Sequence, residues 1–487
     1  MDIVWAFRRA VSRHPDRRFL FDSDAAITYQ GADRLSDEAA VAYIEAGLHL
    51  GDTVALCSPD SIALIVAIIG AWKAGLLPGL IDARTSDANL PYFVKDVGSK
   101  LVVAPKMLHR RLGAAGANAV ADIASFHATG RRGDLHHGPA APLYLSYTSG
   151  TTGTPKGAIL QSGPVTIGTS CVADRLGITK DDVVLATTPT ASSFQLVAAL
   201  MPSIHVGASV GLVAGLTADQ IWETATTHRA SVLVAYPLTL ADMVNHPAAM
   251  KATPFRLALS GGSPLAPRIK RDYGDRLGIP LLESYGQSEL GGFMAMGSMA
   301  DGERALEGFV GRPLPDRPAY VADADGREVP SGHVGEVIVP FGCFRQYINK
   351  PEATDKAMAG GVLHTGDLAI ADADGYLKVL GRTVERKHAA QRGGFLRELE
   401  DAYYEHPGVK HAAVVECGDG EVEAFVELLR GHIVDAHELG EMATAIVGRR
   451  VIPRNTTILE TMPRTFSGKA NRQFLSEACL QQSGPVP

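Results

Sequence analysis

The sequence predicts an α/β protein with a large N-terminal domain of parallel sheets flanked by helices, a small β subdomain, and a small α+β domain at the C-terminus. Three observations predict this fold class. A chain of 487 residues with 46% hydrophobic and 20% charged residues is globular and too long for one core. Short apolar runs alternate with helical stretches over most of the length, and the pattern changes after residue 382.

The first elements show this alternation most clearly. Residues 53–57 have the pattern of a buried strand, and the apolar run 62–72 has that of a buried helix. This run is too short for a membrane span, which needs about 20 residues. Short apolar strands separated by helices are typical of parallel sheets covered on both faces. Further strands of this kind are expected at 100–104, 182–186, 231–235 and 257–260.

The pattern changes twice further along the chain. Between about residues 319 and 339 it becomes short strands with glycine turns, which predicts the small β subdomain. We place the domain boundary after Arg382, so that residues 1–382 form the N-terminal core and residues 383–487 the C-terminal domain. In the C-terminal domain, a helix is expected at 396–405 and strands at 412–415 and 422–429.

Composition excludes several classes of function. The formal net charge of −7, from 46 basic and 53 acidic residues, gives no reason to expect nucleic acid, whose binders carry basic patches. The five cysteines are far apart and form no C-x-x-C pair, which argues against a zinc site and a disulfide framework. The N-terminus soon becomes charged, at Arg8-Arg9, and shows no signal peptide. We therefore expect a cytoplasmic protein with no nucleic-acid or membrane partner.

The strongest local signal is the segment 147–157, in which three glycines, four threonines and a serine accompany Lys156. Glycines let a backbone approach phosphates closely, amides and hydroxyls donate hydrogen bonds, and a lysine adds positive charge. The spacing does not fit a Walker A loop. The segment predicts a different phosphate-binding loop, formed by Thr148, Ser149, Gly150, Thr151, Thr152, Gly153 and Lys156.

This segment resembles the signature of the adenylate-forming superfamily, which holds acyl-CoA synthetases, peptide-synthetase adenylation domains and firefly luciferase. Further motifs of the superfamily follow in order and cover essentially the whole chain. They are 260–265, 283–289, 335–351, 364–368, 381–382, 406–415 and 463–469. The resemblance implies an enzyme that uses ATP and Mg²⁺ to activate an acid as its acyl-AMP, with a mobile C-terminal domain.

The motif 283–289 carries groups suited to a nucleotide and its metal ion. The ring of Tyr285, beside Gly286, offers a flat surface for adenine. Ser288 is suited to donate to the α-phosphate, and Glu289 to hold Mg²⁺, which prefers oxygen ligands beside phosphates. The resemblance assigns further nucleotide contacts to Gly261, Gly262, Ser263, Glu283 and Ser284.

Asp367 and Arg382 complete the predicted nucleotide site. Asp367 follows a Thr-Gly turn, where its carboxylate could accept both ribose hydroxyls. Arg382 is expected to reach the ribose or a phosphate. The alternatives are a cap of a helix or turn for Asp367 and a boundary salt bridge for Arg382.

Lys469 is the predicted catalytic residue, together with Ser288 and Glu289. In the superfamily, the lysine that matches Lys469 bridges the acid carboxylate and the α-phosphate. The reaction brings a carboxylate oxygen onto an anionic phosphorus, and a cation at that junction stabilises the developing charge. We expect in-line attack on the α-phosphorus, with Mg-pyrophosphate leaving, and then transfer of the acyl group to a thiol.

The segment after Arg382 departs from the superfamily pattern. Val384 takes the hinge position, His388 that of a usual lysine, and Gln391 that of a usual glycine. Under one interpretation, Gly393-Gly394 supplies the glycine of this loop two residues later than in the superfamily. Under the other, the thiol step is altered or absent.

The positions that match the superfamily's acid pocket are also unusual. Ser192 stands at the gate position, and Ser193 stands where amino-acid-activating domains place an aspartate for the substrate ammonium. The missing carboxylate argues against an α-amino acid. The serines and Gln195 favour a polar or aromatic acid with hydrogen-bonding substituents. The predicted pocket residues are Ser192, Ser193, Phe194, Tyr236, Gly292 and Phe293.

The leading hypothesis is an acid–thiol ligase that makes an acyl-AMP and then a thioester on CoA or on the phosphopantetheine thiol of a carrier protein. A rival keeps adenylation but uses an amine acceptor, or activates a small inorganic oxyacid such as nitrite. The third is a non-catalytic nucleotide-binding or scaffold protein, against which Lys469, Glu289 and Asp367 argue. The identity of the acid and the choice between monomer and homodimer stay open.

Overall fold

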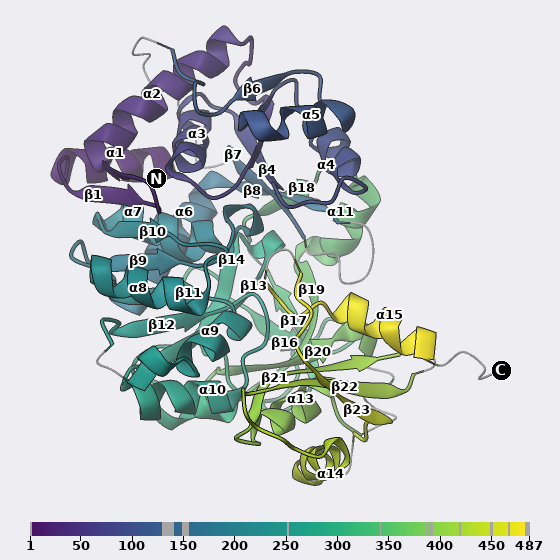
Figure 1. The fold of residues 1–487 in the computed structure, drawn as a ribbon. Coiled ribbons are helices and arrows are strands. Elements are labelled where there is room, and N and C mark those ends of the chain that lie inside the picture. The colour runs from purple at the N-terminus through teal and green to yellow at the C-terminus, as the bar shows by residue number, and fades with distance from the viewer. Residues whose placement is uncertain are drawn as a thin grey trace.

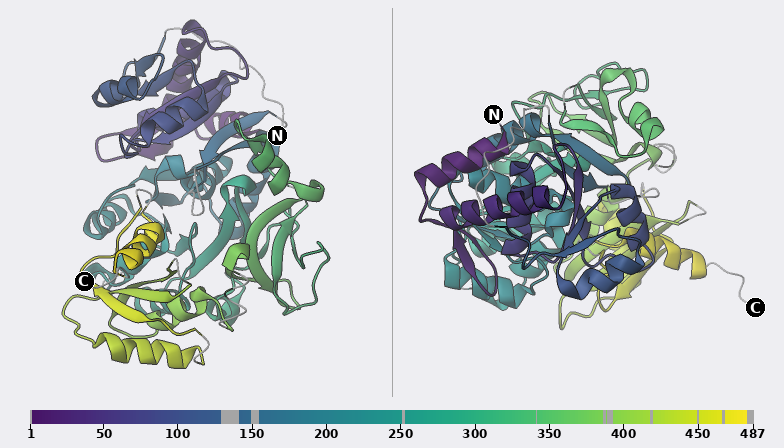
Figure 2. Two further views of the ribbon diagram at one scale, coloured as in Figure 1. Left: turned by 90° about the vertical axis from the view of Figure 1, so that its right-hand side faces the viewer. Right: turned by 90° about the horizontal axis from the view of Figure 1, so that it is seen from above.

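The computed structural model describes most of the chain, with the two termini of the fold at opposite ends of the molecule. Figures 1 and 2 show the purple N-terminal helices at one end and the yellow-green C-terminal domain at the other. Within the described part of the chain, no helix is long and apolar enough to cross a membrane. The described residues are 2–128, 141–148, 155–250, 253–340, 342–385, 388, 393–417, 420–448, 451–465 and 468–482.

A seven-stranded sheet has the order β18-β8-β7-β4-β3-β5-β6. Its strands β7, β4, β3, β5 and β6 run parallel, whereas β8 and β18 are antiparallel to their neighbours. The bounds are β3 Thr53–Ser58, β4 Leu77–Asp82, β5 Val102–Ala104, β6 Val120–Asp122, β7 Pro142–Tyr147, β8 Gly157–Gln161 and β18 Phe344–Tyr347. The strand predicted at 53–57 is confirmed, and the one predicted at 100–104 forms only over its last three residues.

A nine-stranded sheet has the order β15-β14-β13-β12-β11-β9-β10-β1-β2. The six strands from β13 to β1 in this order are parallel, as the apolar runs predict. The bounds are β1 Arg18–Phe21, β2 Ala26–Thr28, β9 Val183–Ala186, β10 Ser209–Leu212, β11 Val232–Ala235, β12 Leu257–Ser260, β13 Leu281–Gln287, β14 Gly292–Met296 and β15 Arg312–Pro313. The strands predicted at 182–186, 231–235 and 257–260 are therefore confirmed.

Helices cover the sheets of the N-terminal domain. The apolar helix α3 starts after Ser61, whose hydroxyl accepts from the amide of Leu64, so the helix predicted at 62–72 is confirmed. Its Gly70 lets the helix approach α2 closely, because a Cβ there would lie 2.7 Å from that of Ala39. The bounds are α1 Ile3–Arg13, α2 Tyr29–Glu45, α3 Ile62–Lys73, α4 Leu90–Val97, α5 Lys106–Ala114, α6 Ser162–Leu176, α7 Met201–Val206, α8 Ala218–His228, α9 Pro237–Val244 and α10 Pro267–Asp272.

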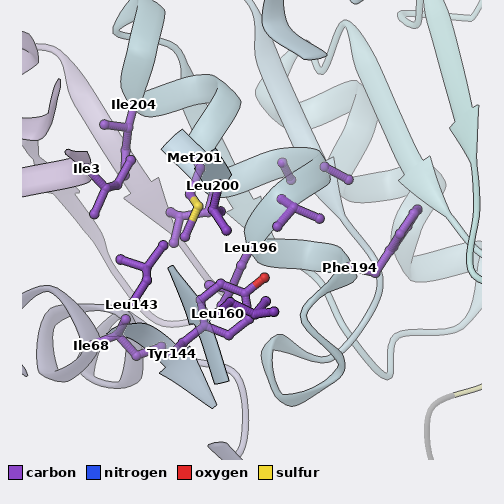
Figure 3. Packing of buried hydrophobic residues seen from close by; sticks show 14 of the residues in the cluster. Ile3, Ile68, Leu143, Tyr144, Leu160, Phe194, Leu196, Leu200, Met201 and Ile204 are labelled. Atoms are coloured by element: carbon purple, nitrogen blue, oxygen red, sulfur yellow. The ribbon is translucent and has the colours of Figure 1, made fainter. Parts of the chain in front are cut away.

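The largest core lies where the two sheets and their helices meet. Leu143 and Leu160 from the seven-stranded sheet pack in one cluster with Leu196 and Met201, from the helical segment that follows β9. Figure 3 shows these side chains from close by, with Phe194 at the edge of the group. Burial of this apolar layer fixes the two sheets relative to each other.

The predicted β subdomain is a four-stranded antiparallel sheet, β16-β17-β19-β20. Its bounds are β16 Tyr320–Ala322, β17 Gly335–Val339, β19 Leu363–Ala371 and β20 Leu377–Arg382, with α11 at Pro351–Ala357. Thr365, Gly366 and Asp367 lie inside β19. The expectation that Asp367 follows a turn is therefore wrong. Pairing with β17 and β20 keeps the segment extended, although Gly366 adopts a left-handed φ of 69°.

The described part of the C-terminal domain holds the separate sheet β21-β22-β23 and the helices α13, α14 and α15. Its helix α13, Leu396–Tyr404, and strands β21, Val409–Glu416, and β22, Val422–Leu428, confirm the expected elements. The others are β23 Asn455–Leu459, α14 Ala436–Ile446 and α15 Arg472–Gln482. The boundary after Arg382 stays a prediction.

Candidate active site

The candidate site lies where the carboxyl ends of the two sheets face each other. Ligands bind at the carboxyl ends of parallel strands in open α/β sheets. Ser146, near the end of β7, and Ser288, directly after β13, come from different sheets, and their hydroxyl oxygens lie 3.5 Å apart. The contact brings the end of β7, which precedes the predicted phosphate loop, next to the motif 283–289.

The described ends of the phosphate loop are tied together. The amide of Thr148 donates to the carbonyl of Lys156 at 2.9 Å, and its hydroxyl accepts from the amide of Lys156 at 3.2 Å. The ammonium of Lys156 lies 4.8 Å from the ring centroid of Tyr347. The predicted residues Ser149, Gly150, Thr151, Thr152 and Gly153 lie outside the described residues.

Glu289 is buried in a short 3₁₀ turn, η5, Ser288–Leu290, directly after β13. The hydroxyl of Tyr347 donates to its carboxylate at 2.5 Å. Burial and this carboxylate raise the pKa of Tyr347, so the phenol stays protonated and orients Glu289. No group of three or more metal-ligating side chains occurs among the described residues. A single carboxylate still fits Mg²⁺, which takes one or two carboxylates and completes its shell with phosphates and water.

The carboxylate of Asp367 has three donors from the protein. The hydroxyl of Tyr285 donates to Oδ2 at 2.7 Å, the side-chain amide of Gln287 also donates to Oδ2, and Nη1 of Arg382 donates to Oδ1 at 2.8 Å. Burial and the neighbouring Asp367 raise the pKa of Tyr285. A carboxylate has about four acceptor sites, so these donors orient Asp367 and leave capacity for another hydroxyl.

Gln287 was missed by the sequence reasoning. It lies two residues after Tyr285 on β13, so its side chain points to the same face of the strand. This alternation is the sequence signal that could have identified Gln287 as a site residue. Its amide also donates to the carbonyl of Thr365 at 2.8 Å and so fixes β13 against β19.

The other predicted nucleotide contacts fall into two groups. Gly261, Gly262 and Ser263 form the loop after β12, and Gly261 touches Phe194, because a Cβ there would lie 2.4 Å from that ring. Glu283 and Ser284 instead have protein partners. The carboxylate of Glu283 lies 2.6 Å from the ammonium of Lys270, and the hydroxyl of Ser284 donates to the carbonyl of Ser260. The nucleotide contacts of all five stay predictions.

The predicted acid pocket is brought together as an aromatic wall. Phe194 stacks on Tyr236 with ring centroids 5.4 Å apart and meets Phe293 edge-on at 5.6 Å. The hydroxyl of Tyr236 donates to Ser192 at 2.9 Å, and Ser192 donates to the carbonyl of Pro189 at 2.8 Å.

Backbone conformation shapes the rest of this pocket. Ser193 ends a 3₁₀ turn, η1, Thr190–Ser192, with a left-handed φ of 58°. A Cβ at Gly286 would lie 1.8 Å from the carbonyl oxygen of Gly292, so glycine is required where β13 passes β14. The six predicted pocket positions are thus neighbours, and their contact with a substrate stays a prediction.

Gln195, which follows Phe194 in the chain, and Thr188 are buried and carry unpaired polar atoms. Both atoms of the Gln195 amide and the hydroxyl of Thr188 have no hydrogen-bond partner within the described part of the chain. Gln195 precedes a π-helical turn, η2, Leu196–Leu200, of the kind often found at functional sites. A bare buried amide is costly, which marks Gln195 as a candidate ligand group.

The ammonium of Lys469 lies 5.1 Å from the ring centroid of Tyr236. A Cβ at Gly262 would lie 3.3 Å from its Cε, so the lysine stands beside the glycine loop after β12. Desolvation lowers the pKa of Lys469 to about 8. No carboxylate in the described ranges pairs with it. Within the described residues, the ammonium is therefore a desolvated cation without a carboxylate partner.

The segment that departs from the superfamily pattern is described only in part. Val384 is 69% exposed, and His388 contacts the carboxylate of Glu416 at the end of β21. Gln391 lies outside the described residues.

Comparison with known proteins agrees with these motifs. Residues 7–341 match the model of the AMP-binding enzyme family, and residues 398–469 match that of the AMP-binding enzyme C-terminal domain. The chain is 29% identical over 482 residues to a sulfoacetate–CoA ligase of Cupriavidus necator, covering 94% of both chains. It is 30% identical over 357 residues to an indoleacetate–CoA ligase of Aromatoleum aromaticum, covering 72% of this chain and 70% of that one.

Solved structures share the fold. ATP-bound MatB from Rhodopseudomonas palustris is 25% identical with a TM-score of 0.85, over 98% of this chain and 99% of that one. The anthranilate CoA ligase AuaEII, in complex with anthranoyl-AMP, is 21% identical with a TM-score of 0.88, over 98% and 97%, and supports the fold alone. With both family models matched in order, this chain belongs to the AMP-binding enzyme family of the adenylate-forming superfamily.

Proposed function

We propose that this chain is an AMP-forming acid–thiol ligase, which activates a small carboxylic acid as its acyl-AMP and passes the acyl group to a thiol. The observation that carries the proposal is the ammonium of Lys469, which is desolvated and has no carboxylate partner among the described residues. A structural lysine in such a place would be paired, because an isolated buried charge is costly. An ammonium kept free is suited to bind anions that arrive with the substrates.

The reaction requires such a cation. A carboxylate oxygen of the acid attacks the α-phosphorus of ATP, and the bond from that phosphorus to the bridging oxygen of pyrophosphate breaks. Lys469 would contact both the carboxylate and the α-phosphate and reduce their repulsion. With a pKa of about 8, most of the lysine carries its charge at pH 7.

The nucleotide would be held on the other side of the site. Asp367 would accept a ribose hydroxyl at its remaining acceptor site, and Arg382 and Lys156 would contact phosphates. Glu289, oriented by Tyr347, would hold Mg²⁺ beside the phosphates. When bound, this ion neutralises phosphate charge. Each assignment uses a side chain whose orientation is already fixed by a neighbour.

The acid is expected to be small, with an aromatic or polar body. Phe194, Tyr236 and Phe293 offer apolar faces, whereas Gln195 offers an unpaired amide. Ser193 provides no carboxylate for a substrate ammonium, which argues against α-amino acids. Sulfoacetate and indoleacetate, named for two relatives of this chain, are small acids of these two kinds.

In the second step, the sulfur of the acceptor attacks the acyl carbon, the bond from that carbon to the AMP oxygen breaks, and the thiol proton passes to solvent. CoA is the first acceptor to test, because the matched relatives are named as CoA ligases. A carrier-protein thiol is the second.

The test is pyrophosphate release from ATP across a panel of acids, with mass spectrometry of the products with and without CoA. The panel includes sulfoacetate, indoleacetate, benzoate, a fatty acid, an α-amino acid and nitrite. Release that depends on one carboxylic acid, with a CoA thioester as product, is expected. An acyl-AMP that reacts only with amines, or release with nitrite alone, would replace the proposal by its rivals. ATP binding with no release on any acid would overturn it.

A further inference from the structure

One carboxylate of the large domain gathers three basic side chains of the C-terminal domain. Asp242, on α9, accepts from Nη2 of Arg464 at 2.7 Å. It also lies 3.1 Å from Nε2 of His411 and 2.9 Å from Nζ of Lys410. Burial alone would raise the pKa of Asp242, but the contact with His411 and the charges of Arg464 and Lys410 hold it well below its usual range. Asp242 is therefore an anion at neutral pH.

The same face of α9 makes an apolar contact with that domain. Leu238 precedes Asp242 by four residues and so lies on the same side of the helix. It packs in one buried cluster with Ala413 and Val415 of β21 and with Met462. These β21 residues alternate with His411 along the strand and share its face. The helix α9 is thus joined to the C-terminal domain by a hydrophobic contact at Leu238 and by an ionic contact at Asp242.

Arg464 links this contact to the loop that carries Lys469. The loop is closed at its base by a bridge between Arg464 and Ala470, and inside it the amide of Thr465 donates to the carbonyl of Lys469 at 2.7 Å. The amide of Lys469 donates in turn to the hydroxyl of Thr465 at 3.2 Å. A displacement of Arg464 would therefore also move Lys469, five residues further along the chain.

The other end of α9 touches the lysine directly. The helix begins at Pro237, and the residue before it is Tyr236, whose ring lies 5.1 Å from the ammonium of Lys469. One short helix thus meets the loop at two points: at the reacting end through Tyr236, and at the base through Asp242. This arrangement can set where the ammonium stands relative to the acid pocket.

We propose that Asp242 is a positioning residue for adenylate formation: it holds the C-terminal domain, through Arg464 and His411, where Lys469 reaches the acid pocket. This inference rests on the proposed function and adds a residue outside the family motifs quoted above. Asp242 touches neither reacting atom, and it acts through the lysine. In the thiol step, no two anions meet at the phosphorus. This step should therefore depend less on the position of Lys469.

The surrounding charges explain why Asp242 matters more than an ordinary surface carboxylate. Lys410 keeps a second partner, Glu427 of β22, at 2.8 Å within its own domain. Arg464 and the fully buried His411 lie 3.2 Å from each other, and Glu427 is the other carboxylate near His411. Burial lowers the pKa of His411, so its imidazole is neutral at pH 7 and the cations at this contact are Arg464 and Lys410. Without the charge of Asp242, Arg464 would face a neutral ring and an amide, which disfavours the docked position.

The experiment compares Asp242→Asn with Asp242→Glu, which keeps the charge. Three rates are measured: acyl-AMP formation in a single turnover with the acid that the wild type uses best, thioester formation from preformed acyl-AMP and CoA, and acetylation of Lys469 by an N-hydroxysuccinimide ester without substrates. Asp219→Asn is the matched control, because Asp219 pairs with His246 at 2.8 Å inside the large domain.

For Asp242→Asn, acyl-AMP formation should fall on the order of 10- to 100-fold, because Arg464 loses its ion pair with a half-buried carboxylate. Thioester formation should stay within about threefold, acetylation of Lys469 should become faster, and Asp242→Glu should restore all three. Asp219→Asn should change none of them.

An equal fall in both half-reactions would show general damage and overturn the proposal, as would an unchanged rate of acyl-AMP formation. Should no acid support pyrophosphate release in the wild type, the proposed function fails by itself. The acetylation rate then still decides the role of Asp242: faster labelling in Asp242→Asn supports it, and unchanged labelling overturns it.

Discussion

The two charged groups that matter most in the site are prepared in opposite ways. Asp367 receives donors from Tyr285, Gln287 and Arg382, so both of its oxygens are engaged before any ligand arrives. The ammonium of Lys469 lies over the face of the Tyr236 ring and has no carboxylate partner among the described residues. One group is fixed by the protein, whereas the other is kept available.

This difference follows from what each group has to do. A carboxylate that selects a ribose needs a fixed orientation, which neighbouring donors supply. An ammonium that neutralises charge in a transition state loses effect if a protein carboxylate already neutralises it. The depressed pKa of Lys469 is the cost of keeping it unpaired.

Removal of the unpaired cation should have the largest effect. Lys469→Ala should slow acyl-AMP formation about 100- to 1,000-fold, the usual effect of losing a preorganised charge at the reacting centre. ATP binding should change little. Pyrophosphate release and equilibrium binding of a fluorescent ATP analogue measure the two quantities. The matched control is Lys356→Ala, at an exposed position on α11. An equal loss of ATP binding would instead make Lys469 an ordinary nucleotide contact.

A smaller loss is expected on the paired side. Asp367→Asn removes one charge and leaves Arg382 without its carboxylate, so kcat/KM for ATP should fall about 10- to 100-fold. The effect should appear mainly in KM. Asp372→Asn, at the end of the same strand pair and bridged to Arg304, is the control and should change nothing. A fall in kcat with KM unchanged would contradict the assignment of Asp367 to nucleotide binding.

The smallest effect concerns Gln195, whose amide is unpaired like the ammonium of Lys469 but uncharged. Gln195→Leu removes a bare buried amide, so the melting temperature should be unchanged or rise, with a gain of about 1 kcal/mol at most. The preference for acids with polar substituents over apolar ones should fall about tenfold. Thermal unfolding and competing-acid assays measure both. A marked loss of stability would mean that the amide already has a partner.

The sequence predicts most of this fold because its strands are short apolar runs between helices. It also predicts the neighbours Tyr285, Asp367 and Arg382, because motif residues in a known order identify the family. It places Asp367 after a turn, whereas pairing with two neighbouring strands keeps that segment extended. Strand pairing depends on the partners, which local residue types do not reveal.

Contacts between distant segments could not be predicted. The hydroxyl of Tyr347 reaches Glu289 across 58 residues, and His411 reaches Asp242 across 169. Nothing in the local pattern of α9 distinguishes Asp242 from any other helical carboxylate. Its role arises only when β21 and the loop of Lys469 dock on that helix.

The titration of the Lys469 ammonium tests the central claim most directly. Carbon-13 NMR of protein labelled at lysine Cε, with Lys469→Arg to assign the signal, gives the midpoint. The account predicts a midpoint near pH 8 in the free protein, because the ammonium is desolvated and unpaired, and a rise when ATP brings negative charge beside it. A midpoint at the ordinary value of 10.5 that does not respond to ATP would contradict it.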